Sequence, residues 1–324
     1  MPFHLDAKIK KISTFCLKLL LSGALLLFLI RKANIHEMIH AAYSTRFGFL
    51  LIGVLLYPLG QIVCAIRWKL LAHALKIERD LKHMTALYFI GMFFNLFLPT
   101  SIGGDFIRII YLTPSKSRMT RSSFLSVLAE GVTGIISTLP LASAAMLSSY
   151  GAPLPSRLRF WFPIFSGLIV LFLCTVPFFV RYLPQRMYLT FDRHLRVFWE
   201  KPLTTILAIL YSTVFYAIVI TIHVCIAHAL SLRIAIPYLM IMIPLGSLSG
   251  LFPSVNGIGT RDAAYVYLLT RIGIDSTHAL LFSLMWFFVL ALSSLIGCIV
   301  YLIRGLSPEA AEIEAGSITV DAEA

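Results

Sequence analysis

Apolar residues follow one another in long runs along this chain, and short groups of charged residues separate the runs. A helix needs about 20 apolar residues to cross the hydrocarbon core of a bilayer. Six runs meet that length: residues 12–30, 47–66, 122–147, 161–180, 203–230 and 278–303. The pattern predicts an all-α, polytopic helical membrane protein with six full spans.

Two further apolar runs, 84–98 and 236–252, are interrupted before they resume as helical patterns. Each interruption contains a proline followed by two glycines: Pro99, Gly103 and Gly104 in the first, and Pro253, Gly257 and Gly259 in the second. Proline ends a helix and glycine permits a sharp turn. We expect each broken run to form a helical hairpin, which gives eight apolar segments in all.

The positions of Lys and Arg indicate how the two hairpins are threaded. If all eight segments cross, 13 of these 27 residues lie on one side and 14 on the other. If both hairpins are re-entrant, 18 lie on the side of the N-terminus, seven lie opposite and two fall within the hairpins. Only the second threading satisfies the positive-inside rule. It predicts opposed hairpins, an inverted repeat of the kind found in transporters, and cytoplasmic N- and C-termini.

Composition excludes several classes of protein. The chain is 59% hydrophobic and 13% charged, with a mean hydropathy of +0.88, whereas a soluble domain is about 25% charged. This excludes a soluble enzyme and a nucleic-acid-binding domain, so the net charge of +12 is assigned to loops that face anionic lipids. Residues 1–306 form the predicted membrane domain, and residues 307–324, with five acidic and no basic side chains, form a disordered acidic tail.

The breaks are the candidate sites. Irregular backbone at membrane depth must be buried in protein or line a wet cavity. The second helix of each hairpin starts near the membrane centre, where its backbone N–H groups and dipole attract an anion. Glycines there let a ligand approach the backbone. The alternative is that the glycines only permit turns and close helix packing.

Arg108 and Arg261 lie beside the two breaks. A guanidinium group matches phosphate oxygens in two-point geometry, which predicts phosphate binding. The alternative is a structural ion pair, since Asp105 lies three residues before Arg108 and Asp262 follows Arg261. Either aspartate could instead stabilise the start of its helix.

Glu130 lies eight positions after residue 122, roughly 12 Å into its predicted span. An ionisable group at that depth is expensive and is expected to be functional. It carries a proton during a cycle, neutralises an arginine, or forms a static salt bridge. The predicted substrate-binding residues are Gly103, Gly104, Asp105, Arg108, Glu130, Asn256, Gly257, Gly259, Arg261 and Asp262.

No metal, cofactor or catalytic residue is predicted. The five cysteines are scattered singly, and His223 and His228 point about 140° apart on one helix, which favours packing hydrogen bonds over metal binding. No phosphate-binding loop of the type G-x-x-x-x-G-K-[ST] occurs.

Three ordered motifs resemble those of the lysylphosphatidylglycerol synthase transmembrane-region, or flippase-like, family. They are Pro99 with Gly104-Asp105-Phe106-Ile107-Arg108, Ser126-Val127-Leu128-Ala129-Glu130, and Pro253 with Gly257-Ile258-Gly259-Thr260-Arg261-Asp262. The resemblance covers residues 10–305. Three positions depart from the family pattern: Gly131 stands where many members have Arg, Gly134 or a neighbour replaces an acidic residue, and Asp262 replaces the commoner Glu.

The resemblance implies a membrane domain that moves a phospholipid, or a polyprenyl or hopanoid-type lipid, between leaflets of a bacterial cytoplasmic (inner) membrane. The expected partners are lipids with anionic headgroups, with a homo-oligomer or a lipid-synthesis enzyme as further candidates and no nucleic acid. The aminoacyl-transfer domain of the full synthase is absent from this sequence, so aminoacyl transfer is not expected. Two alternatives stay open: a membrane-embedded transferase that uses a lipid-phosphate donor, with Glu130 or Asp262 as base, and an accessory subunit of a lipid-synthesis complex.

Overall fold

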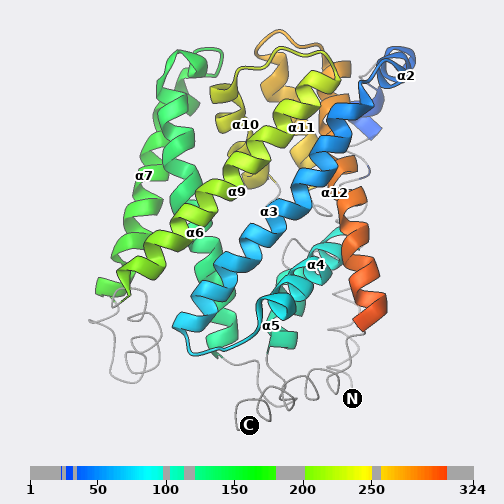
Figure 1. Cartoon of the computed structure of the whole chain (residues 1–324). Helices are drawn as coiled ribbons and strands as arrows, with labels where there is room; N and C mark the ends of the chain where they lie inside the picture. The colour runs from blue at the N-terminus through cyan, green and yellow to red at the C-terminus, as the bar shows by residue number, and fades with distance from the viewer. Residues whose placement is uncertain are drawn as a thin grey trace, which may run out of the picture.

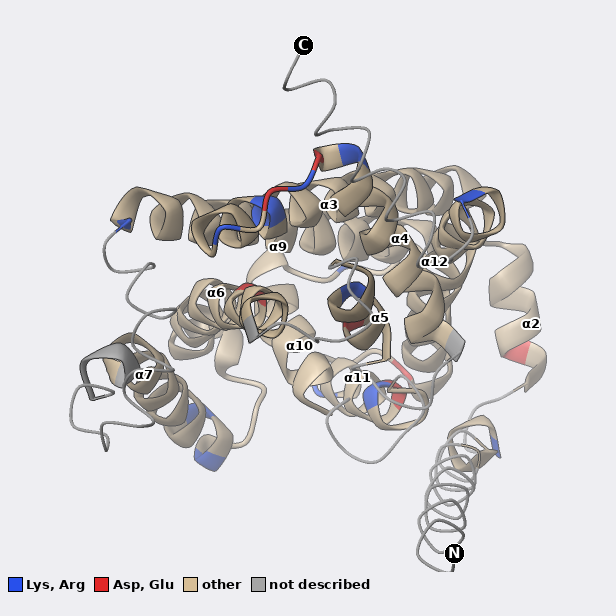
Figure 2. Cartoon of the chain, turned by 90° about the horizontal axis from the view of Figure 1, so that it is seen from below, with Lys and Arg blue, Asp and Glu red and all other residues tan. Residues whose placement is uncertain are grey.

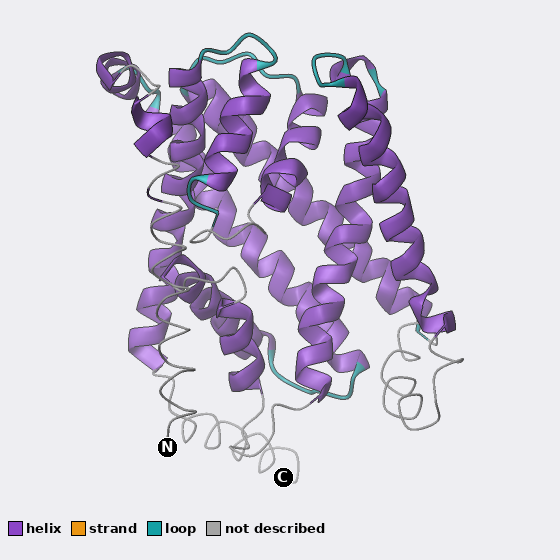
Figure 3. Ribbon diagram, turned by 180° about the vertical axis from the view of Figure 1, so that it is seen from behind, coloured by secondary structure: helices purple, strands orange, loops and turns teal. Residues whose placement is uncertain are grey.

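The computed structural model describes residues 23, 27–31, 35–97, 103–112, 121–179, 201–249 and 257–304 of the 324-residue chain. Within these ranges the protein is helical and contains no strand (Figure 3). The α-helices are α2 (Ile35–Tyr43), α3 (Phe47–Ala74), α4 (Leu81–Phe97), α5 (Gly103–Leu112), α6 (Arg121–Leu147), α7 (Ser156–Phe179), α9 (Pro202–Ala229), α10 (Ile236–Ser249), α11 (Thr260–Thr270) and α12 (Ser276–Arg304).

Five of these helices are long and apolar enough to cross a membrane: α3, α6, α7, α9 and α12. They correspond to five of the six spans expected from the sequence, which confirms a polytopic helical membrane protein. The first expected span, 12–30, lies largely outside the described residues.

Helices α3 and α9 run antiparallel along their whole length (Figure 1). At one end the Arg46 backbone N–H donates to the Ala229 carbonyl oxygen at 3.0 Å. Halfway along, Gly60 lies against the Phe215 ring, where a Cβ would be 3.1 Å from the nearest ring carbon. This pair defines two faces of the molecule. The upper face of Figure 1 holds Arg46 and Ala229, and the lower face holds the end of α3 and the start of α9.

Helices α4 and α5 form a hairpin that starts and ends at the lower face. The Gly104 N–H at the start of α5 donates to the Asn95 side chain near the end of α4. Arg108, further along α5, lies over the ring of Tyr88, which is earlier in α4. The two helices are therefore antiparallel. The Arg79 side chain, just before α4, donates to the Leu112 carbonyl oxygen at the end of α5 (3.2 Å). The two ends of the hairpin therefore meet on one face.

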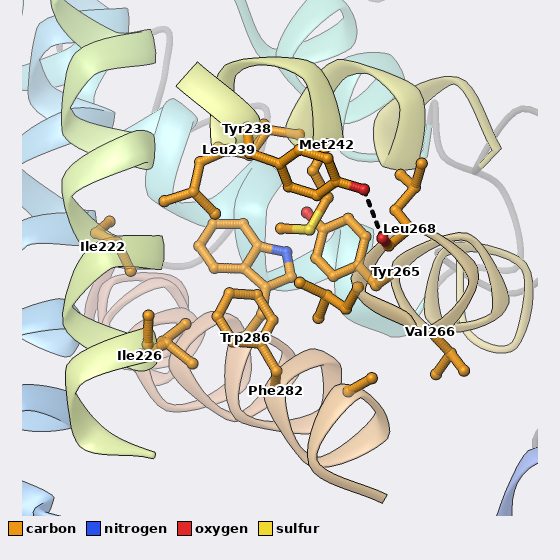
Figure 4. Close-up of a cluster of buried hydrophobic side chains, with 14 of the residues drawn as sticks. Ile222, Ile226, Tyr238, Leu239, Met242, Tyr265, Val266, Leu268, Phe282 and Trp286 are labelled. Carbon is orange, nitrogen blue, oxygen red and sulfur yellow. Dashed lines mark hydrogen bonds between the residues drawn. The ribbon is translucent and has the colours of Figure 1, made fainter. Parts of the chain in front are cut away.

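Helices α10 and α11 form the corresponding hairpin at the upper face. The Tyr238 hydroxyl near the start of α10 donates to the Leu268 carbonyl near the end of α11 (Figure 4). Towards the break, Gly246 packs against the Tyr265 ring so closely that a Cβ would lie 2.1 Å from it. Both ends of this hairpin therefore meet on the upper face of the bundle (Figure 1). The expected pair of opposed re-entrant hairpins is thus confirmed (Figure 1).

The largest buried cluster joins α9 to the second hairpin and α12 (Figure 4). His223 packs against this cluster: it is fully buried, and its ring centroid lies 4.3 Å from that of Trp286. One ring nitrogen bonds the Val219 carbonyl and the other bonds the Tyr265 hydroxyl at 3.0 Å. The expected packing role of this histidine is confirmed, and it holds α11 against the α3–α9 pair.

Candidate functional site

Glu130 accepts hydrogen bonds from three helices. Its Oε1 accepts a hydrogen bond from Arg67 Nη2 on α3 at 2.7 Å and another from the Tyr88 hydroxyl on α4 at 2.6 Å. Its Oε2 accepts a hydrogen bond from Arg108 Nη1 on α5 at 2.9 Å. The glutamate is 3% exposed. A buried carboxylate is stable only with such partners, so these contacts fix α6 to the first hairpin and to α3.

Arg108 bonds a second carboxylate as well. Its Nη2 contacts Asp105 Oδ1 at 2.6 Å, and its guanidinium lies 4.2 Å from the Tyr88 ring and 5.0 Å from the Trp68 ring. Of the two interpretations of Arg108 from the sequence, these contacts favour structural pairing. The prediction that it binds phosphate stays a prediction.

Arg67 is a buried charge that the sequence analysis assigned to a loop. Helix α3 continues to Ala74, eight residues beyond the predicted run, and Arg67 is 7% exposed. Its Nη1 donates to Ser212 Oγ on α9 at 2.6 Å, while its Nε has no partner among the described residues. The missed signal is the spacing of Gln61, Cys64, Arg67, Trp68 and Leu71, which all lie on one buried helical face.

At the first break, both predicted glycines are buried at the start of α5. The Gly104 N–H donates to Asn95 Oδ1 at 2.7 Å, so this N–H is already bonded. A Cβ at Gly104 would lie 2.0 Å from the Gly91 carbonyl oxygen. Close helix packing therefore requires glycine at this position, and an anion at this helix start would rely on the N–H groups that follow.

At the second break, Gly257 and Gly259 have φ angles of 76° and 82°. These values lie in the left-handed region that glycine adopts without strain. Asp262 accepts the Gly259 N–H at Oδ2 (2.9 Å) and the Ser283 hydroxyl at Oδ1. It therefore caps α11, one of the two roles considered for it, and Asn256 lies outside the described residues.

Arg261 differs from the other two buried arginines. It is 8% exposed, and its Nε and Nη2 have no hydrogen-bond partner among the described residues. The nearest carboxylate oxygen, on Asp262, is 3.8 Å from Nη2, beyond hydrogen-bond distance. Since buried guanidinium groups are normally bonded, Arg261 retains two donors for a ligand.

A cavity of ≈ 630 Å³ extends from the Glu130 group to the second break. Arg67 and Glu130 line one part of it, and Gly257, Arg261 and Tyr265 line another. Most of the remaining lining is apolar and comes from α3, α6, α9, α10 and α12. Among the described residues, the buried charged side chains lie on α3, α5, α6 and α11, and Figure 2 shows the charged positions of α5, α6 and α11.

A smaller cavity of ≈ 250 Å³ lies beside the first hairpin. Asp105 and Arg108 line it, and Tyr57, Phe215 and Leu290 belong to the walls of both cavities. The structure thus divides the predicted residues into two groups. Asp105, Arg108 and Glu130 form one ion-pair group, while Gly257, Gly259, Arg261 and Asp262 surround the second break.

Comparison with known proteins supports the family indicated by the motifs. The family described as "Lysylphosphatidylglycerol synthase TM region" matches residues 15–297. The UPF0104 membrane protein PH1989 of Pyrococcus horikoshii is 24% identical over 133 residues, which are 40% of this chain and 40% of that protein. No solved structure matches the chain. Since the family match covers most of the sequence, the chain belongs to the lysylphosphatidylglycerol synthase transmembrane-region family.

Proposed function

We propose that this protein binds the headgroup of an anionic lipid in the 630 Å³ cavity and carries the lipid between the two leaflets. The observation that carries the proposal is Arg261, a buried guanidinium in the wall of that cavity with two donors that have no partner among the described residues. The cavity is within the usual size range of small-ligand sites, about 300–1,000 Å³. Its largely apolar lining suits the acyl region of a lipid, and the start of α11 adds a positive dipole end near Gly257.

The hydrogen bonds of the two candidate bases favour transport over a transferase. Both oxygens of Glu130 and both oxygens of Asp262 already accept hydrogen bonds. A general base needs a free lone pair within reach of the proton that it removes. Three of the roughly four acceptor positions of Glu130 and two of those of Asp262 are taken, so both carboxylates already serve as structural acceptors, and this favours transport.

Purified protein in vesicles with fluorescent phosphatidylglycerol in one leaflet tests the proposal. We expect leaflet exchange faster than in protein-free vesicles, with no new lipid product. Arg261→Lys keeps the charge but loses the two-point fork, and losing a charged hydrogen bond of about 1.5–3 kcal/mol should slow exchange about tenfold or more. Arg271→Lys is the matched control, because Arg271 is an exposed residue at the end of the same helix.

The outcomes separate the candidate functions. Exchange no faster than in protein-free vesicles contradicts lipid transport. A covalently altered lipid would support the transferase instead. Equal exchange by the Arg261→Lys and wild-type proteins would remove Arg261 from the binding site.

A further inference from the structure

The acceptor groups in the wall of the large cavity determine which headgroups it can hold. Glu130 is the one acidic residue among the described residues that line it. The Glu130 oxygens accept from Arg67, Tyr88 and Arg108. Residues 250–256, which complete the second break, contain no Asp or Glu. Among the described lining residues, an ammonium group entering this cavity would find no carboxylate except Glu130, which two arginines already neutralise, and a buried charge without a counter-charge is strongly unfavourable.

The uncharged oxygens of the wall suit a different kind of group. Hydroxyls of Ser212, Ser247 and Thr138 donate to backbone carbonyls of their own helices at 2.9–3.0 Å. Tyr216 donates in the same way to the Met240 carbonyl at 2.6 Å. Because these protons are used, the lone pairs of the Thr138, Tyr216 and Ser247 oxygens are available as acceptors, whereas Ser212 Oγ already accepts from Arg67 Nη1. Such acceptors match the O–H groups of a hydroxylated headgroup.

The wall formed by α6 leaves room for a headgroup larger than a phosphate. Gly131 and Gly134 both line the cavity, one turn apart. A Cβ at Gly131 would meet no atom within 4 Å, and a Cβ at Gly134 would meet only Arg67 Nη1 at 3.8 Å. Packing therefore does not require glycine at either position. What these glycines provide is volume directly beside Arg67 and Glu130.

We propose that the ligand is a phosphodiester lipid of net negative charge whose headgroup is hydroxylated and uncharged, and that a cationic headgroup is excluded. The inference rests on the proposed function and names the substrate class of the same cavity. The phosphate binds at Arg261, and the hydroxylated group occupies the space beside Gly131. Lysylphosphatidylglycerol, the lipid in the family's description, carries ammonium groups and does not fit this wall.

Binding to the purified full-length protein tests the inference with three lipids. We expect phosphatidylglycerol to bind at least tenfold more tightly than lysylphosphatidylglycerol. Phosphatidic acid, which lacks the hydroxylated group, reports phosphate binding alone. Gly131→Leu should weaken phosphatidylglycerol binding at least fivefold and leave phosphatidic acid binding unchanged. Gly167→Leu is the control, since a Cβ at Gly167 also meets nothing within 4 Å and this residue of α7 is exposed away from the cavity.

Two results would overturn the inference: equal affinity for phosphatidylglycerol and lysylphosphatidylglycerol, or equal weakening of phosphatidylglycerol and phosphatidic acid by Gly131→Leu. Arg261→Lys distinguishes these from failure of the proposed function. If phosphatidylglycerol and lysylphosphatidylglycerol bind with equal affinity and both require Arg261, the headgroup assignment alone is wrong. If no lipid requires Arg261, the proposed site itself is wrong. Thermal unfolding of each variant in detergent confirms that it is folded.

Discussion

At the scale of single residues, Glu130 joins four helices through hydrogen bonds to Arg67, Tyr88 and Arg108. Its depth in an apolar run is visible in the sequence and predicts that it needs a partner. One partner, Arg108, could be named because it lies beside the first break. Arg67 could not be named, because it is 63 positions away and its charge follows the end of the apolar run 47–66. A charge at the end of such a run faces either water or the protein, and hydropathy does not distinguish the two.

Glu130→Gln tests how much this group stabilises the fold. Glutamine cannot neutralise two arginines, and breaking a buried ion pair costs about 3–5 kcal/mol. We expect a clear fall in the thermal unfolding temperature in detergent. Adding Arg108→Gln should restore only part of the stability, because Arg67 stays unpaired, and adding Arg67→Gln as well should restore more. Wild-type stability of the single variant would contradict the role of Glu130 as a required counter-charge.

The same variant tests whether Glu130 carries a proton. Glutamine resembles the protonated acid, so a carrier role predicts a folded protein that binds lipid and does not exchange it between leaflets. Lipid binding and leaflet exchange are measured on one preparation. Leaflet exchange at the wild-type rate would eliminate the carrier role.

At the scale of helices, the sequence predicts where each element breaks better than how closely the elements pack. Proline and glycine mark both breaks in the sequence, and the helices that flank each break lie where they were expected. The approach of Gly104 to Gly91 and of Gly297 to the Phe89 carbonyl, where a Cβ would lie 2.0 Å from the facing oxygen in each case, could not be predicted. Glycine is common in membrane helices, and sequence alone does not show which glycines touch another backbone.

Gly104→Ala and Gly131→Ala should therefore change stability in opposite directions. The added methyl at residue 104 collides with the Gly91 carbonyl, and forced overpacking costs about 1–3 kcal/mol or more. The methyl at residue 131 meets nothing within 4 Å, and alanine favours the helix over glycine by about 1 kcal/mol. The unfolding temperatures of both variants and of the wild-type protein, measured in one detergent, test the predicted loss and the predicted gain of stability. A stable Gly104→Ala protein would show that α4 and α5 are not in backbone contact.

Asp275 predicts a pH dependence at the start of α12. Its Oδ1 accepts the N–H groups of Thr277 and His278 at 2.9 and 3.0 Å, and its Oδ2 contacts His278 Nδ1 at 2.7 Å. Partial burial opposes ionisation, but the bonds from His278 and Thr277 outweigh it and lower the pKa of Asp275. An acid with a lowered pKa stabilises the fold above its unfolded pKa, about 3.9, and loses that effect as the pH falls through the folded value.

Asp275→Ala should accordingly cost about 1 kcal/mol at pH 7, the usual cost of losing a helix cap. The difference from wild type should shrink once the pH is below about 3.9. Unfolding temperatures measured from pH 3 to pH 7 test this, with Asp275→Asn as a neutral cap that varies less with pH. A constant difference across that range would contradict the assignment.

At the scale of the whole molecule, charge counting predicts the opposed hairpins correctly even though one of the counted residues, Arg67, is buried. The positive-inside rule still gives the same threading when Arg67 is left out, because the bias of 18 to seven does not depend on one residue. The shape of the 630 Å³ cavity could not be predicted, since it depends on side chains from α3, α6, α9 and α12 that are distant in sequence.

Cysteine labelling tests the orientation in the membrane. In a variant without the five native cysteines, Arg79→Cys and Ser115→Cys should both react from the cytoplasmic side. Arg233→Cys, in the loop before α10, should react from the other side. Ser115 lies outside the described residues, but its label reports on the face to which α5 returns. Reaction of Arg79→Cys and Ser115→Cys from different sides would contradict a re-entrant first hairpin.

Among the described residues, the charges around the two cavities occur in equal numbers of each sign: Arg67, Arg108 and Arg261 against Asp105, Glu130 and Asp262. An electric field across the membrane therefore exerts no net force on this set when its members move together. The field would act on the cargo alone. For a headgroup with one negative charge, the membrane potential contributes about 2.3 kcal/mol per 100 mV, directed towards the positive side. Voltage would then favour movement of an anionic lipid towards the positive side, in addition to the effect of its concentration difference between the leaflets, and a lipid without net charge would not respond to voltage.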